Sequence, residues 1–175
     1  GPHSSVADTD CGLDLELAVA YRMSWLNRHP GRRTLAESSS AERELVPGIT
    51  RVANPPAEMK LDAFYKKYVS ANGYPVLSSG KVNDFALYEA AFLVNLLLAK
   101  RPDVKQAMVE SGSRLIVLAH DEYTTAVPEY ANLKPKRYWD RRARGLGGSS
   151  TDPLCSCGEE NLLGYPGDPY STENI

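Results

Sequence analysis

The chain has 175 residues, the size of one domain, and its 20 basic and 22 acidic residues give a formal net charge of −2. This balance provides no overall attraction to nucleic acid or to an anionic membrane surface. No apolar run approaches the roughly 20 residues of a membrane-spanning helix, so no membrane partner is expected. Residues 1–4, Gly-Pro-His-Ser, are interpreted as the remnant of a cleaved expression tag, and no signal peptide is visible.

The N-terminal third predicts one helix and an irregular arm. Apolar residues recur at helical spacing over 13–28, and Pro30-Gly31 ends the pattern. The residues that follow have weak periodicity and are interrupted by Asn54-Pro55-Pro56. We therefore assign 5–56 to an N-terminal helix and an arm that lies over the domain, and 57–175 to the α+β domain itself; a true domain boundary near residue 55 is the less favoured alternative.

A second helix is predicted over 60–71, where large apolar residues keep the spacing of a helical face. Asn72-Gly73 is interpreted as its left-handed cap. The residues of this face are Leu61, Phe64, Tyr65, Tyr68 and Val69.

The central stretch predicts a strand near 74–78, helices over 83–100 and 102–111, and a strand near 115–119. Such a crossover usually joins parallel strands, and the apolar run at 115–118 suits a strand buried on both faces. The predicted fold is α+β or α/β, rich in helix, with a small mixed sheet and a further strand near 159–164. One core is expected from Phe85, Phe92, Leu96, Leu115 and Val117.

His120, Asp121 and Glu122 directly follow the second strand of the crossover. The end of a strand in such a sheet is a common place for ligand contacts, so these residues are a candidate binding surface. A solvated turn is the commoner role for such a sequence. Adjacent carboxylates also point in different directions and do not form an acid–base pair by themselves.

Residues 134–144 interleave basic and aromatic side chains, among them Arg141, Arg142 and Arg144. This composition suits a phosphate or a single-stranded nucleic acid. An amphipathic helix whose arginines pair with the chain's own acids is favoured instead, because the whole chain is acidic.

Cys11, Cys155 and Cys157 are the three cysteines. The two close ones are too tightly spaced for an ordinary disulfide with each other, and no second pair completes a structural zinc site. A bridge from Cys11 to one of them fits a secreted protein. Three unpaired cysteines are the alternative, and the sequence leaves both open.

Two blocks near the C-terminus, with two weaker ones upstream, resemble a family of secreted zinc-metallopeptidase-like proteins of the zincin type. The specific blocks are Tyr138–Gly148 (YWDRRARGLGG) and Glu159–Tyr170 (EENLLGYPGDPY), and the weaker ones are Phe64–Tyr68 and Arg101–Val104. The resemblance covers roughly residues 60–175. It implies a zincin-like scaffold, an extracellular location and, for the full-length family, zinc.

In that family the segment corresponding to Glu173-Asn174-Ile175 leads into the active-site helix, which carries His-Glu-x-x-His. This motif is absent from the 175 residues, so no catalytic or metal-binding residue is carried over, and no cofactor is expected in this chain. The chain is expected to be truncated before that helix. Its expected partner is the missing segment or a second protein chain.

Three functions follow. The chain is expected to supply the scaffold and substrate-groove surface of a metallopeptidase-like hydrolase that acts on peptides or proteins, and to be inactive alone. The alternative is a non-catalytic extracellular binding or structural module. A phosphate or nucleic-acid binder acting through 134–144 is the third, and nucleic acid is the least expected partner.

Overall fold

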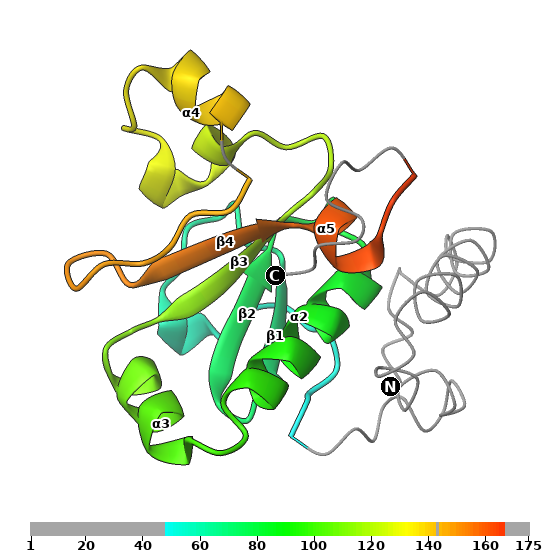
Figure 1. Ribbon diagram of the computed structural model, residues 1–175, viewed down its shortest axis with the longest axis vertical. Helices are drawn as coiled ribbons and strands as arrows, with labels where there is room; N and C mark the ends of the chain where they lie inside the picture. Colours follow the sequence, from blue (N-terminus) through cyan, green and yellow to red (C-terminus); the bar gives the residue numbers. More distant parts are fainter. Residues whose placement is uncertain (1–47, 143, 167–175) are drawn as a thin grey trace.

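The computed structural model describes residues 48–142 and 144–166, so the helix predicted over 13–28 lies outside the described residues. The described part is an α+β fold with a four-stranded mixed sheet in the order β1-β2-β3-β4 (Figure 1). The elements are β1 (Lys67–Ala71), β2 (Tyr74–Ser78), α2 (Asp84–Leu97), α3 (Pro102–Glu110), β3 (Arg114–Leu118), α4 (Lys136–Arg142), β4 (Leu154–Gly158) and α5 (Glu159–Leu163), with single-turn helices η4 (Ala57–Met59), η5 (Thr124–Ala126) and η6 (Pro128–Tyr130).

The predicted crossover is confirmed. Strand β2 pairs in parallel with β3, with Leu77 opposite Ile116, and the chain between them forms α2 and α3. Asn83 caps α2 by accepting a hydrogen bond from the backbone N–H of Phe85, and Pro102 occupies the first turn of α3. Strand β4 is parallel to β3, so β2, β3 and β4 all end at the same edge of the sheet.

Both faces of the sheet are covered, which explains the continuous apolar sequence of β3. Val117 points into the cluster formed with α2 and α5, whereas Ile116 and Leu118 point into the cluster on the other face. The second cluster is closed by Val127 and Tyr130 of the long connection between β3 and β4. Successive side chains of a strand point to opposite faces of the sheet, so neighbouring residues of β3 belong to different clusters.

The helix predicted over 60–71 is wrong, because this segment ends in a strand. β1 pairs antiparallel with β2, and the turn between Ala71 and Tyr74 is Asn72-Gly73. Both turn residues have positive φ, 50° and 89°, as the tight turn of a β-hairpin requires. The aromatic spacing fitted a helix by coincidence, and the Asn-Gly pair between two apolar runs was the stronger signal.

The strand predicted near 159–164 is also wrong. The strand is β4, immediately before it, and Glu159–Leu163 forms the short helix α5. Leu162 and Leu163 are buried in the same cluster as α2. Gly164 ends α5 as a left-handed cap with a φ of 65°. The two adjacent leucines alone did not distinguish this short helix from a strand.

The predicted core is correct for Val117, which is fully buried, but wrong for Leu96, whose side chain is 53% exposed. Phe85, Phe92 and Leu115 lie at the margin of the core and are only partly buried. The buried stripe of α2 is instead built around Ala86, Leu87, Ala90, Ala91 and Leu93. Alanines allow a helix to approach a sheet closely. The sequence prediction gave more weight to large side chains and therefore placed the buried face of α2 wrongly.

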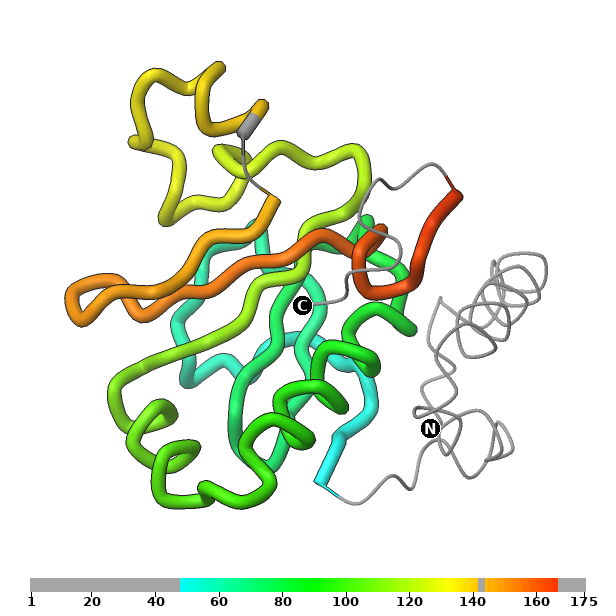
Figure 2. Tube along the Cα trace, viewed as in Figure 1, coloured from blue at the N-terminus to red at the C-terminus, as the bar shows by residue number. Residues whose placement is uncertain are grey.

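Each outer strand is flanked by a further segment. Ile49 and Ala53 make isolated antiparallel bridges to Ala71 and Tyr68 of β1. On the far side, Leu146 bridges to Ser156 of β4, and Figure 2 shows these two orange limbs running side by side up to the turn that joins them.

Substitution of leucines in α2 tests the position of the core. Leu87→Ala is expected to lower the free energy of unfolding by about 2–5 kcal/mol, because Leu87 is fully buried. Leu97→Ala removes the same atoms from a side chain that is 72% exposed and should change it by less than about 0.5 kcal/mol. Chemical denaturation measures both, and equal effects would contradict the assigned face.

Stability should decline in alkaline solution. Burial raises the pKa of the Tyr130 phenol and of the Cys157 thiol, each to about 12. As pH rises from about 9 to 12, the unfolded chain releases these protons while the folded chain keeps them, so the free energy of unfolding falls. Tyr130→Phe should make this decline shallower, whereas Tyr138→Phe at a half-exposed ring should not. Superimposable pH profiles for all three proteins would refute the assignment.

Candidate binding site at the carboxyl edge of the sheet

Three segments converge where the parallel strands end. The loop after β2 leads to the cap of α2 at Asn83, the loop after β3 contains residues 119–122, and α5 begins directly after β4. This carboxyl edge is the usual place for ligand sites in sheets with parallel strands. Figure 1 shows the end of β4 and α5 beside one end of α2.

Glu159 joins the three segments through one buried carboxylate. Its Oε2 accepts a hydrogen bond of 2.8 Å from the backbone N–H of Asn83. Its Oε1 accepts one of 2.9 Å from the backbone N–H of His120. The Glu159 side chain is only 2% exposed, so these bonds are shielded from water and are strongly favoured over an unsatisfied donor or acceptor.

The same carboxylate orients the imidazole of His120. Nδ1 lies 2.9 Å from Oε1 of Glu159, and because the carboxylate already serves as an acceptor, Nδ1 is the donor. In the neutral imidazole, a proton on Nδ1 leaves Nε2 with its lone pair. The ring is also in edge-to-face contact with Tyr165 at a centroid distance of 5.8 Å, and the His120 side chain remains 63% exposed.

Arg144 holds the loop that carries His120. Its guanidinium makes a two-point contact with Glu160, with Nε 2.6 Å from Oε1 and Nη2 3.0 Å from Oε2. It also donates to the backbone carbonyls of Ala119 and Glu122. Oε2 of Glu122 accepts from the backbone N–H of Ala119, so the loop is bonded both internally and to Arg144. The backbone that carries the imidazole is therefore held in place by hydrogen bonds.

The structure brings together some of the residues predicted from sequence and separates others. His120, Glu122 and Arg144 belong to one network, whereas Asp121 faces outward in an exposed pair with Lys81 at 3.3 Å. Arg141 lies apart, on α4. The side chain of Arg142 lies outside the described residues.

Glu159 is the central residue that sequence reasoning missed. It is 39 residues from His120 along the chain, and no local pattern connects the two. A usable signal was present, because an acid that follows a strand and opens a helix falls at the carboxyl edge of a sheet.

The described residues do not form a metal site. Among 48–142 and 144–166, no group of three or more histidine, cysteine or acidic side chains is arranged to hold a metal ion. Cys155 and Cys157 form no disulfide with each other, Cys157 is buried, and Cys11 lies outside the described residues. The bridge to Cys11 stays a prediction.

Comparisons with known proteins found no match: no protein-family model, curated protein or solved structure is significantly similar to this chain. Within the part of the chain that the structure describes, no helix is long and apolar enough to cross a membrane.

Glu159→Gln tests the support of His120. An amide in this position offers only one acceptor oxygen, so its NH₂ group faces either the Asn83 N–H or the two donors of His120. The free energy of unfolding is expected to fall by about 1–3 kcal/mol. Nitrogen NMR of the imidazole should show the Nδ1–H tautomer in the parent protein and a mixture in the variant.

Glu110→Gln is the matched control, because Glu110 is exposed on α3 and makes one side-chain hydrogen bond, to Gln106. An unchanged tautomer and unchanged stability in Glu159→Gln would show that this carboxylate does not orient the ring.

Proposed function

We propose that this chain forms the scaffold and part of the substrate-contacting surface of a zinc-metallopeptidase-like hydrolase, with His120 as the polar group presented to a peptide substrate. The observation that carries the proposal is the His120–Glu159 pair. An exposed imidazole whose Nδ1 is bonded to a buried carboxylate is the arrangement by which proteins fix a histidine for proton acceptance.

The place of this pair in the fold supports the proposal. It lies at the carboxyl edge of β3, where ligand contacts are most common in parallel sheets. A histidine needed only for stability would not be expected to remain 63% exposed while a buried carboxylate orients its ring. The buried carboxylate of Glu159 therefore orients an imidazole that faces solvent.

The zincin-type identity rests on the two C-terminal sequence blocks, and their packing is consistent with a shared role. Arg144 of the first block binds Glu160 of the second. The first block also contacts β4 just before the second, where the backbone N–H of Ser156 donates to the carbonyl of Leu146 at 2.9 Å. Two neighbouring strings thus build one end of the sheet beside His120.

No chemical step is assigned to zinc, because the described residues do not fit a zinc ion. The step assigned to the described residues is smaller. Nε2 of His120 accepts a hydrogen bond or a proton from water or from a peptide N–H, while Glu159 keeps the opposite nitrogen protonated. The attacking group and the metal would come from sequence beyond this chain.

The reading frame downstream of Ile175 in the parent gene tests the proposal. It is expected to encode His-Glu-x-x-His, and the protein that includes it should cleave peptides in a chelator-sensitive manner, whereas the present chain alone should not. In that longer protein, His120→Ala should lower kcat/KM by about 10²-fold or more, the scale of a lost acid–base group.

Tyr123→Ala is the control. Tyr123 is exposed in the same connection between β3 and β4, and the substitution removes a ring of comparable size. A downstream frame without a zinc motif would favour the non-catalytic binding module. If the longer protein is active and His120→Ala leaves kcat/KM unchanged, the hydrolase proposal stands but His120 is not part of its substrate site.

A further inference from the structure

A second surface, independent of the carboxyl edge, is formed by α4 and the residues before it. This segment belongs to the long connection between β3 and β4 and lies apart from α2 and α3 (Figure 1). Between 130 and 142 its sequence contains five basic residues and one acidic residue, Asp140. We call the exposed side chains Lys134, Lys136, Arg137, Tyr138 and Arg141 the α4 surface.

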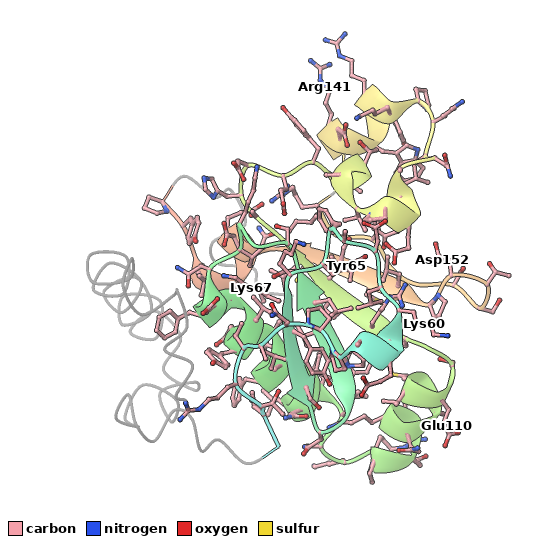
Figure 3. The ribbon with its side chains drawn as sticks, turned by 180° about the vertical axis from the view of Figure 1, so that it is seen from behind. Lys60, Tyr65, Lys67, Glu110, Arg141 and Asp152 are labelled. Atoms are coloured by element: carbon pink, nitrogen blue, oxygen red, sulfur yellow. The ribbon has the colours of Figure 1, made fainter. Side chains whose placement is uncertain are left out.

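The cations of the α4 surface make no hydrogen bond or ion pair with any described side chain. The sequence favoured arginines of 134–144 that pair with the chain's own acids, and Arg144 does so by binding Glu160. Arg141 instead extends from α4 away from the sheet (Figure 3). The positive charge is therefore presented to solvent rather than used within the described fold.

The one acid of the helix is turned toward the body of the protein. Oδ1 of Asp140 accepts a hydrogen bond from the backbone N–H of Thr125, and Oδ2 accepts one from its hydroxyl, each at 2.9 Å. Thr125 is buried, so Asp140 attaches α4 to η5. Lys136, Arg137 and Arg141 remain exposed, and the local charge is more positive than the net charge of −2 indicates.

An aromatic ring lies among these cations. Tyr138 is 50% exposed and packs edge-to-face against Trp139 at a centroid distance of 5.5 Å. The indole Nε1 of Trp139 donates to the carbonyl of Lys134, which fixes the supporting ring. A half-exposed ring on the same short helix as the cations offers a stacking surface near positive charge.

We propose that the α4 surface binds single-stranded nucleic acid, with Lys136, Arg137 and Arg141 on backbone phosphates and a base stacked on Tyr138. The seven residues of α4 are about 10 Å long, enough for a few nucleotides. The combination of a cationic face with an aromatic ring is the one by which proteins hold single strands without sequence preference.

An anionic membrane is the competing partner for a basic helix, and the α4 surface suits it less well. Binding at a membrane interface requires a large apolar face of exposed leucine, phenylalanine or tryptophan opposite the cations. Here Trp139 is partly buried and engaged in a hydrogen bond, and Tyr138 is the exposed ring. Single strands need only the stacking ring and the phosphate contacts.

The test is fluorescence anisotropy of a labelled oligodeoxythymidylate with the full chain at increasing salt. Three phosphate contacts predict that log K falls against log salt with a slope of about −2. Arg137→Glu with Arg141→Glu should weaken binding by about tenfold or more. Tyr138→Ala should weaken it by about fivefold or more, and Tyr138→Phe, which keeps the ring, should not.

Lys66→Glu with Lys100→Glu is the control, because it changes the net charge equally at exposed lysines outside the α4 surface. Circular dichroism confirms that each variant is folded. Binding that is absent, independent of salt, or equally weakened by the control pair overturns the proposal. Binding to phosphatidylserine vesicles without binding to the oligonucleotide overturns it in favour of a membrane.

Discussion

The carboxylate of Glu159 is the constraint on which the arrangement of the carboxyl edge depends. A sheet fixes where its strands end but not how the loops beyond them are placed relative to one another. Glu159 supplies that second level of order, because its two oxygens bind backbone N–H groups of the segments after β2 and β3. Buried hydrogen bonds of this kind are costly to leave unmade, so the three segments hold one another in place.

The position of His120 follows from this constraint. Its backbone and its ring are bonded to the same oxygen, so the orientation of the imidazole is coupled to the conformation of its loop. Arg144 adds a second support by binding the carbonyls of Ala119 and Glu122. Exposure and rigidity usually oppose each other in a side chain, and this network combines them.

The sequence predicted the elements whose signals are long and local. Helix α2 has fourteen residues, a capping Asn83 and a clear end, and β3 is a continuous apolar run, so both could be found from the pattern. β1 and α5, each as short as β3, carried no such continuous pattern. Strand pairing across Asn72-Gly73, a hairpin signal that the aromatic spacing obscured, decided the first, and packing on α2 decided the second.

The candidate site divides in the same way. His120 could be proposed because it follows a recognisable strand, but the residue that gives it a role, Glu159, becomes its neighbour only when β3 and β4 pair in parallel. Likewise, the sequence located the basic residues of α4 but not the direction of Asp140, which depends on a contact with Thr125 fifteen residues away. Pairings at long sequence separation are the information that the pattern of one chain does not contain.

The flanked edges of the sheet limit how another molecule can attach. A strand from a second chain, added beside β1 or β4, would compete for backbone groups that already pair with Ile49, Ala53 or Leu146. Recognition by strand addition, and the stacking of sheets that leads to aggregates, both need an open row of such groups. In the described part of the chain, the bridged positions of these edges are therefore less open to strand addition than the loops and helix surfaces are to side-chain contacts.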